Sequence, residues 1–592
     1  MISRCDDEAG ADETERGGAR YRAILAPIAV TLVAAAWWVA WHPTEFGQQD
    51  QAIFLPHVYR AMDPGYLPHD EFLNEGPQHI AFTHVAAFLA RFMSIERAMY
   101  VLRIVQVLGV FTVLMAGCHI LFRRPLRTFI IATILFNHRL FQSVEGYYFF
   151  TPFAGPVPLA WAAAIGAFLA AMRGRVVWSA GLLAVGTLFH PLIGGQTLVG
   201  IAAAQLLTRG SRPAGRTVSA LIVLSVAFVG GALPLILRDL RLSSSGMTGE
   251  QFVHVLCHIR HPQHTIITSF GTMRLIRLAM TLSTAIVWLL WLRRRDDVAS
   301  RGAVAHLAGL YLGLIVTAVA GFVLIEWLPT VIGAKLYPYR CLVYFEIFGA
   351  LCAASVLGDG AGNIQAARER GPAGWLGLAS VAAAALALAF AWVIRPAVGT
   401  ITFQLTAAPI LLAVWGLTSF VRGRPLFVSG LVTTLAVGVL LTDRAAIGGR
   451  LGQRLWTAHW NQIPAAVMEA YLFIRDHCPP DATYMIGPNI DEFRAFARRR
   501  PYFDFKCFPF SEWGAEQWYR SYLEMPGADR PLTELFDLGA RKHVDYLMLR
   551  FDSPRQREEF IRDVQPYAER LGARSIFFNG ECAVFQFNRP PG

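Results

Sequence analysis

The loop after the first apolar stretch carries carboxylates that could do chemistry beside a membrane. Between residues 43 and 96 it holds Glu45, Asp50, Asp63, Asp70, Glu71 and Glu75. A carboxylate near a bilayer is costly unless it is hydrated, paired, or bound to a metal or a substrate. Asp50 stands between Gln49 and Gln51, so amides rather than turn-forming residues flank it. Such a carboxylate can take a proton from a sugar hydroxyl or hold a divalent cation.

Asp63 has a plainer explanation than Asp50. Asp63-Pro64-Gly65 is a typical turn sequence, because proline presets its own φ, glycine accepts a positive φ, and aspartate can accept a hydrogen bond from nearby backbone. We therefore expect Asp63 to form a solvated turn and Asp50 to be the functional carboxylate of this loop.

Two cations frame the segment AKLYPYR at 334–340. Lys335 and Arg340 enclose Tyr337 and Tyr339, and Arg340 opens an apolar stretch, where a charge without a partner is costly. Such a pair at the outer surface of a membrane can bind the diphosphate of a lipid carrier. Interfacial anchoring alone would also explain the lysine and the tyrosines. We favour phosphate binding, with Arg340 as its main contributor.

His190 lies in a connection between two short apolar stretches and is followed by Pro191, Gly194 and Gly195. Proline and glycine break helices, which is tolerated at membrane depth only around a protein-lined or watery cavity. His190 could donate a hydrogen bond to a phosphate or to an acceptor sugar. A tight turn with a solvated histidine explains the pattern equally well.

The segment HVLCHIRHPQH at 254–264 concentrates histidines around Arg260. His254 and His258 are four residues apart and would share one helical face, a spacing that could suit a metal. The run contains no acidic partner, and Pro262 ends any helix there. A phosphate-facing patch acting through Arg260 is the better functional interpretation, and a plain polar loop remains the alternative.

A short outer connection at 143–153 contains Glu145, Tyr147 and Tyr148. An acidic residue beside aromatic rings is a typical sugar-binding combination. We therefore assign Glu145 and Tyr147 to a possible rim of the site.

These residues must be held by apolar helices, because the composition excludes an ordinary soluble protein. Of 592 residues, 54% are hydrophobic and only 16% are charged, and the mean hydropathy is +0.41. The apolar excess must face lipid. With 23–41 as the first, the apolar stretches predict about thirteen crossings of a bilayer. The later stretches are 97–122, 126–142, 154–172, 176–190, 192–208, 217–237, 276–292, 303–326, 341–358, 374–394, 400–420 and 426–442.

The net charge of +11 sits in arginine clusters at every second connection. That pattern follows the positive-inside rule of cytoplasmic loops and argues against a nucleic-acid partner. It predicts a bacterial inner-membrane protein with a cytoplasmic N-terminus. The first loop and the C-terminal part then share the periplasmic side. Residues 1–20 are rich in acidic residues and predict a disordered cytoplasmic tail.

The predicted fold is mainly α: a polytopic transmembrane helical bundle at 21–442 and a soluble extracytoplasmic α/β domain at 443–592. Within loop 43–96, residues 79–92 have apolar residues at helical spacing and predict a helix in the membrane interface. In the terminal domain, helices are expected at 464–477, 491–500 and 511–523, and a further helix is expected after the strand at 545–549 and through Arg570. Strands are expected at 483–486, 502–505 and 545–549, with a hairpin at 575–587 around Asn579-Gly580.

The eight cysteines include no C-x-x-C pair, which argues against a metal or thioredoxin-like motif. Cys478, Cys507 and Cys582 fall in the terminal domain. A periplasmic location would allow a disulfide between two of them, and buried thiols are the equally plausible alternative.

This organisation resembles the GT-C superfamily of polytopic glycosyltransferases that use polyprenyl-phosphate sugars. The resemblance rests on the long first outer loop with an early acidic residue, its interfacial helix, the many spans and the terminal domain. It implies that Asp50 is the base or metal ligand, and that Asp70-Glu71 is a further acidic motif. Many members carry an Asp-Glu pair directly after the first span, where this sequence has Gln49-Asp50-Gln51. The sequence looks closer to an uncharacterised bacterial branch of this superfamily. That resemblance rests on His190-Pro191 before a glycine pair, Tyr337-Pro338-Tyr339-Arg340, and Phe493-Arg494 with Asp504-Phe505-Lys506.

The sequence thus predicts a membrane glycosyltransferase with a polyprenyl-phosphate-linked sugar as its donor and a divalent cation as a possible cofactor. Arg340, Lys335, Arg260 and His190 would bind the donor phosphate. A transporter or lipid flippase, or a non-catalytic envelope assembly protein, are the alternatives.

Overall fold

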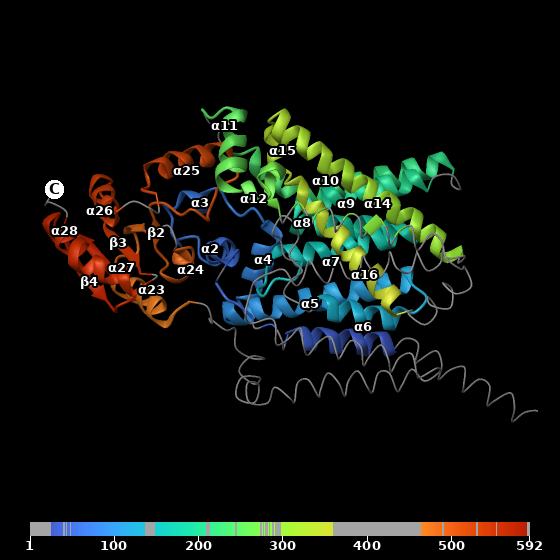
Figure 1. Ribbon diagram of the computed structural model, residues 1–592, viewed down its shortest axis with the longest axis horizontal. Helices are drawn as coiled ribbons and strands as arrows, with labels where there is room; N and C mark the ends of the chain where they lie inside the picture. The colour runs from blue at the N-terminus through green and yellow to red at the C-terminus, as the bar shows by residue number, and fades with distance from the viewer. Residues whose placement is uncertain are drawn as a thin grey trace, which may run out of the picture.

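The computed structural model divides into a long helical bundle and a compact terminal domain at one end of it (Figure 1). It describes residues 25–39, 42, 44–47, 49–136, 149–208, 213–242, 246–272, single positions between 275 and 289, 298–358, 463–487, 490–527, 531–551 and 553–588. The tail at 1–20, the stretches expected between 374 and 442, and the rim residues Glu145 and Tyr147 lie outside these ranges.

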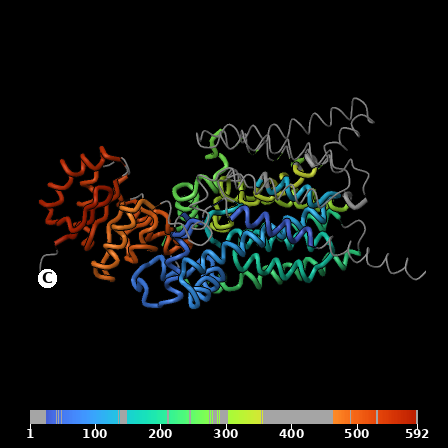
Figure 2. Tube along the Cα trace, turned by 90° about the horizontal axis from the view of Figure 1, so that it is seen from below, coloured from blue at the N-terminus to red at the C-terminus, as the bar shows by residue number. Residues whose placement is uncertain are grey.

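The bundle consists of apolar helices that run side by side (Figures 1 and 2). They are Leu25–Val39, α5 (Ile95–Leu121), α6 (Pro125–Phe136), α7 (Pro156–Met172), α8 (Val176–Phe189), α9 (Pro191–Leu207), α10 (Ala214–Asp239), α14 (Val298–Phe322) and α16 (Leu342–Gly358). Three helical stretches among the described residues are long and apolar enough to cross a membrane: Ile95–Leu121, Ala214–Asp239 and Gly302–Trp327. The expected total of about thirteen crossings stays a prediction.

Short helices gather at the end of the bundle that faces the terminal domain (Figure 1). The loop at 43–96, which the sequence analysis predicts to be the first outer loop, forms α2 (Gln51–Met62), α3 (Glu71–Asn74) and α4 (Ile80–Leu89). The connection after α10 forms α11 (Gly249–Val253), the π-helix η2 (His254–Arg260), α12 (Pro262–Thr265) and η3 (Ile267–Ser269). The connection after α14 forms the π-helix η4 (Val323–Trp327), α15 (Val331–Lys335) and the 3-10 turn η5 (Pro338–Cys341).

The helix expected at 79–92 is confirmed as α4. Its residues Phe82 and Ala86 are buried, whereas Phe88 and, just after the helix, Phe92 are exposed. One apolar face therefore packs inside the protein and the other points outward. Its expected location in the membrane interface stays a prediction.

The terminal domain is an α/β layer built on a five-stranded sheet of order β2-β1-β3-β5-β4. Its elements are α23 (Ala465–His477), β1 (Thr483–Ile486), α24 (Phe493–Phe496), β2 (Arg500–Pro501), α25 (Glu512–Glu524), α26 (Leu532–Arg541), β3 (Tyr546–Arg550), α27 (Pro554–Glu559), η6 (Phe560–Val564), α28 (Gln565–Arg570), β4 (Ala573–Phe578) and β5 (Cys582–Phe587). The strands β2, β1 and β3 pair in parallel, and β5 pairs antiparallel with β3 and β4.

Most expected elements of this domain are confirmed, including the hairpin β4–β5 around Asn579-Gly580. Gly580 has φ +88°, a conformation that glycine adopts at no steric cost. Two expectations are wrong. The helix at 491–500 is reduced to the single turn α24, and the strand expected at 502–505 is instead the short β2. The non-glycine residue Arg498 takes φ +51° just after α24, which ends the helix and turns the chain back toward β1.

Cys478, Cys507 and Cys582 are buried free thiols in the structure. Of the two alternatives for these residues, the structure therefore shows buried thiols rather than a disulfide among them. Burial also raises the pKa of Cys582 to about 12, so its thiol stays protonated.

The terminal domain docks directly on the first outer loop. The ring of Phe496 meets that of Phe46 edge-on at 6.2 Å, and the guanidinium of Arg498 lies 4.8 Å from the centre of the Tyr59 ring. Residues of both segments share one buried apolar cluster, which also includes Leu55 and Val58 of α2. This docking brings the loop that carries Asp50 against the sheet domain.

Candidate active site

Asp50 stands at the start of α2, in a segment fixed by its neighbour Gln51. The Gln51 side chain accepts a hydrogen bond from the backbone N–H of Gly47 at 2.8 Å and donates one to the carbonyl of Ala154 at 3.0 Å. Asp50 itself is half-buried, and among the described residues its carboxylate makes no hydrogen bond. The position of this carboxylate is therefore set by its neighbours, while its oxygens stay available.

A buried arginine joins this segment to the connection that precedes α7. Arg103 of α5 is fully buried, and it donates to the carbonyls of Pro152 and, at 2.9 Å, His42. The backbone N–H of Glu45 donates to the same Pro152 carbonyl at 2.9 Å. Satisfied buried polar groups rigidify their surroundings, so the backbone that leads to Asp50 rests on the helical bundle.

Arg340 and His190 meet, although they are far apart in the sequence. Nη1 of Arg340 lies 2.7 Å from Nε2 of His190, and its guanidinium lies 4.8 Å from the centre of the Tyr337 ring. A guanidinium has no acceptor, so His190 accepts through Nε2 and carries its proton on Nδ1. Burial and the Arg340 charge hold the pKa of His190 well below its ordinary value, so the ring is neutral.

His79 packs against His190, with ring centres 4.9 Å apart. Its Nδ1 lies 3.1 Å from the carbonyl of Phe189, so this nitrogen is the donor. Burial lowers the pKa of His79 to about 4. The start of α4 thus closes one side of the pair formed by Arg340 and His190.

Arg260 ends η2 and is directed by the terminal domain. Its Nη2 donates to the carbonyl of Lys506 at 2.9 Å, and its guanidinium lies 4.9 Å from the centre of the Phe505 ring. Burial lowers the pKa of Arg260, and nearby negative groups, including the carboxylates of Asp504 and Asp50, act in the opposite direction. Asp50 and Arg260 are therefore within electrostatic reach of each other.

His261 lies near both arginines and contacts Tyr337. Its ring meets that of Tyr337 edge-on at 5.6 Å. Burial and the charges of Arg260 and Arg340 hold the pKa of His261 well below its ordinary value. In the described part of the chain, three buried nitrogens here have no hydrogen-bond partner: Nδ1 of His190, Nδ1 of His261 and Nε of Arg260.

The structure thus brings together four residues that the sequence analysis proposed separately: Asp50, His190, Arg260 and Arg340. We call these four residues, with His79, His261 and Tyr337, the basic cluster. His79 and His261 carry no functional motif of their own. The only local signals for them are the place of His79 at the start of the helix predicted at 79–92 and the place of His261 beside Arg260. Half-buried cations and neutral imidazoles within electrostatic reach of a carboxylate can bind an anion and transfer a proton.

Other proposed residues lie elsewhere. The Nζ of Lys335 lies 5.2 Å from the centre of the Phe252 ring, and none of the described contacts joins it to Arg340. Glu71 is exposed in the first turn of α3. Asp70 is buried and paired with Arg494. Asp63 forms the expected turn, in which its side chain accepts from the N–H of Gly65 at 2.9 Å.

Asp50, and His254 with His258, are the metal ligands that the sequence suggested. No group of three or more His, Cys, Asp or Glu residues in the described ranges could hold a metal ion. His254 and His258 do stack at 5.5 Å on one face of η2, as their spacing predicts.

Residues 465–525 match a family model described as a domain of unknown function (DUF6798). No curated protein matches the chain. Two solved structures of ArnT from Cupriavidus metallidurans are similar to it. The one bound to undecaprenyl phosphate has 16% identity, covers 95% of this chain and 97% of that chain, and has a TM-score of 0.50. The apo structure has 14% identity, covers 96% and 98%, and has a TM-score of 0.45.

ArnT is a GT-C glycosyltransferase, so the likeness to its lipid-bound structure shows that this chain has a GT-C-like fold. The fold that the resemblance implied is thereby confirmed.

Proposed function

We propose that this chain, whose fold is GT-C-like, is a membrane glycosyltransferase that takes a sugar from a polyprenyl-phosphate donor. The observation that carries the proposal is the basic cluster. Two arginines lie beside His190 and His261, three nitrogens of this group are buried without a partner among the described residues, and Arg260 is within electrostatic reach of the half-buried Asp50 carboxylate. A buried polar group without a hydrogen bond costs about 1–3 kcal/mol, so a bound anion at this place would offset that cost.

In the proposed reaction, Asp50 accepts the proton of an acceptor hydroxyl while the hydroxyl oxygen attacks the anomeric carbon of the donor sugar. A carbon–oxygen bond to the acceptor forms, and the bond between the anomeric carbon and the phosphate oxygen breaks. The phosphate leaves with the bonding electrons and stays attached to its lipid. Arg340 and Arg260 stabilise the charge that develops on this oxygen. The neutral ring of His190 is positioned as an additional donor through Nδ1, and the neutral ring of His261 offers a further nitrogen near the two arginines.

The proposed setting is the extracytoplasmic side of a bacterial inner membrane. The support is the distribution of arginine clusters, which assigns the first outer loop and the terminal domain to one compartment. The apolar length of α5, α10 and the stretch Gly302–Trp327 supports entry of a lipid-linked substrate from the bilayer. Lys335, Glu71 and the rim residues Glu145 and Tyr147 are proposed as outer contacts for the headgroup or the sugar.

The test compares Asp50→Asn with Asp63→Asn in the full-length protein in lipid nanodiscs. Asp63 is a matched control, because asparagine can also accept the hydrogen bond of its turn. Transfer is followed by mass spectrometry of membrane glycolipids incubated with the protein, and binding is measured with undecaprenyl phosphate. Loss of the general base should slow transfer by about 10²–10⁴-fold while undecaprenyl phosphate still binds.

Two results would overturn this function. Equal transfer by both variants would show that Asp50 is not the general base. If Arg340→Gln binds undecaprenyl phosphate as tightly as the native chain, the proposed phosphate site is wrong. Uptake of a lipid into proteoliposomes without any sugar transfer would support a transporter instead.

A further inference from the structure

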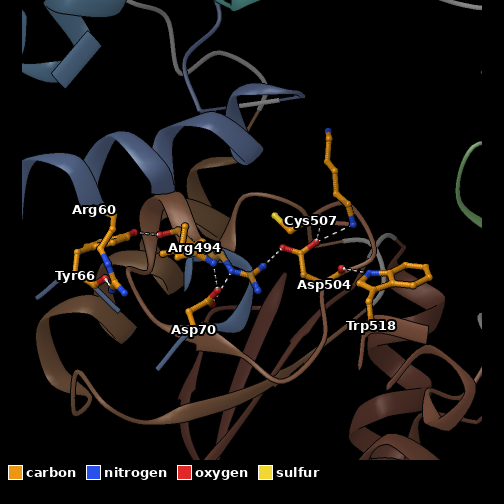
Figure 3. Close-up of polar contacts among 9 residues, drawn as sticks. Arg60, Tyr66, Asp70, Arg494, Asp504, Cys507 and Trp518 are labelled. Atoms are coloured by element: carbon orange, nitrogen blue, oxygen red, sulfur yellow. Dashed lines mark hydrogen bonds and ion pairs between the residues drawn. The ribbon is translucent and has the colours of Figure 1, made fainter. Parts of the chain in front are cut away.

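A buried arginine joins the first outer loop to the terminal domain. Arg494 of α24 donates through Nε to the carboxylate of Asp70 at 2.8 Å and through Nη1 to that of Asp504 at 2.5 Å (Figure 3). The side chain of Arg494 is 7% exposed and each carboxylate is 1% exposed. Figure 3 shows the guanidinium lying between the two carboxylates. We call these three residues the interdomain triad.

The backbone supports the same junction. The hydroxyl of Tyr66 donates to the carbonyl of Arg494 at 2.5 Å, and Asp70 also accepts from the N–H of Leu73 at 3.1 Å to cap α3. Asp70 is therefore held by α3 as well as by Arg494. Three charges at this depth are tolerated because each is paired and hydrogen-bonded.

Asp504 connects Arg494 to a tight turn of the terminal domain. Its Oδ1 accepts from the backbone N–H of Lys506 at 2.9 Å and of Cys507 at 3.2 Å, while its Oδ2 binds Arg494. The indole N–H of Trp518 donates to the Asp504 carbonyl at 3.0 Å. The Asp504 carboxylate thus binds Arg494 through one oxygen and stabilises the turn 504–507 through the other.

This turn directs Arg260 of the basic cluster. The Lys506 carbonyl accepts from Nη2 of Arg260, and the Phe505 ring lies beside the same guanidinium. Among the described residues, both contacts that fix this guanidinium come from the turn, and η2 supplies only the backbone from which the side chain extends. The orientation of Arg260 therefore depends on the docked terminal domain.

We propose that Arg494 is a positioning residue of the anion site: through Asp504 and the turn 504–507 it couples docking of the terminal domain on the first loop to the orientation of Arg260. The anion site is then complete only in the docked arrangement. The first loop carries both Asp50 and Asp70, so one docking event aligns the base and the phosphate ligand. This inference rests on the proposed function, because it takes the donor phosphate as the ligand of Arg260.

The test is a double-mutant cycle between Arg494→Met and Arg260→Gln in the full-length protein in nanodiscs, with undecaprenyl phosphate as the probe. Loss of one oriented charge-assisted contact should weaken binding by about tenfold in either single variant. The double variant should bind no more weakly than Arg260→Gln, because Arg494 acts through Arg260. Arg562→Met is the matched control: Arg562 is exposed, pairs with its neighbour Asp563, and its replacement should leave binding unchanged.

Asp504→Asn provides a milder variant in case Arg494→Met, which leaves two buried carboxylates facing each other, fails to fold. Asparagine can still accept from the Lys506 and Cys507 amides, but it loses the ion pair. Hydrogen exchange at residues 70–74 and 493–507 reports docking without any ligand. We expect faster exchange in both segments together with weaker binding.

The outcomes separate this inference from the proposed function. If Arg260→Gln binds undecaprenyl phosphate as tightly as the native chain, the proposed phosphate site is wrong. If Arg260→Gln weakens binding and the Arg494→Met effect multiplies with it, Arg494 acts independently of Arg260 and the coupling is wrong. If Asp504→Asn loosens docking and leaves binding unchanged, the coupling is wrong as well.

Discussion

Gly47 lies where the first loop meets the terminal domain, and its replacement by alanine tests how the docking is built. Its φ is +75°, and a Cβ at this position would stand 2.1 Å from Cζ and 2.5 Å from Cε2 of Phe496. The Phe496 ring has little room to move, since it is 5% exposed and stacks on Tyr471 with ring centres 6.1 Å apart. Alanine therefore brings both backbone strain and a steric clash.

The two effects have separate magnitudes. A left-handed backbone conformation costs a residue with a Cβ about 1–2 kcal/mol, and overpacking of a filled contact costs about 1–3 kcal/mol. We expect Gly47→Ala to weaken docking by about 2–5 kcal/mol. Gly174→Ala is the matched control, because Gly174 has φ +69° with nothing within 4 Å of its Cβ position. It should cost about 1–2 kcal/mol, from the strain alone.

The assay is hydrogen exchange of the segment 493–498 in the full-length protein. A loss of 2 kcal/mol in docking free energy should speed exchange there by about 30-fold. Glycolipid transfer should fall too, because the N–H of Gly47 donates to Gln51, the residue next to Asp50. Gly174→Ala should leave exchange at 493–498 unchanged. Equal exchange of this segment in both variants would refute the packing argument.

Two further perturbations test the supports of the site. Arg103→Met removes the guanidinium that donates to the carbonyls of Pro152 and His42, and the Pro152 carbonyl keeps a second donor, the N–H of Glu45. The change should lower the free energy of unfolding by about 1–3 kcal/mol. The exposed Arg97→Met on the same helix should change it by less than about 0.5 kcal/mol in the same denaturant titration, and similar values for both would contradict the role of Arg103. Burial lowers the pKa of His57 from 6.5 to about 3. Below pH 6.5, His57 binds a proton in the unfolded chain but not in the folded chain. As the pH is lowered from 6.5 to about 3, this residue should therefore lower the free energy of unfolding by about 1.4 kcal/mol per pH unit. His57→Gln should reduce that slope when unfolding is measured across this range, and an unchanged slope would exclude a neutral buried His57.

Local patterns in the sequence predicted the elements well. Apolar stretches became helices near the expected bounds, as in Pro156–Met172 and Ala214–Asp239. The hairpin followed from Asn579-Gly580, because a positive φ at glycine is a property of the residue itself. The ends of α24 and the location of β2 did not follow. Pairing of Thr483 with Arg500 decided them, and such pairing depends on a strand that is distant in the sequence.

For the candidate site, too, the sequence determined some features and the tertiary structure determined others. The sequence determined the residue types: a carboxylate among amides at Asp50, and cations at Arg260 and Arg340 that are costly without partners. Only the tertiary structure decided which of these cations would lie near Asp50, because separate connections must fold back to one end of the bundle. It also decided that Asp70 would pair with Arg494, 424 residues away. The energy of such a pair depends on distance and burial in space, which no local pattern of residues encodes.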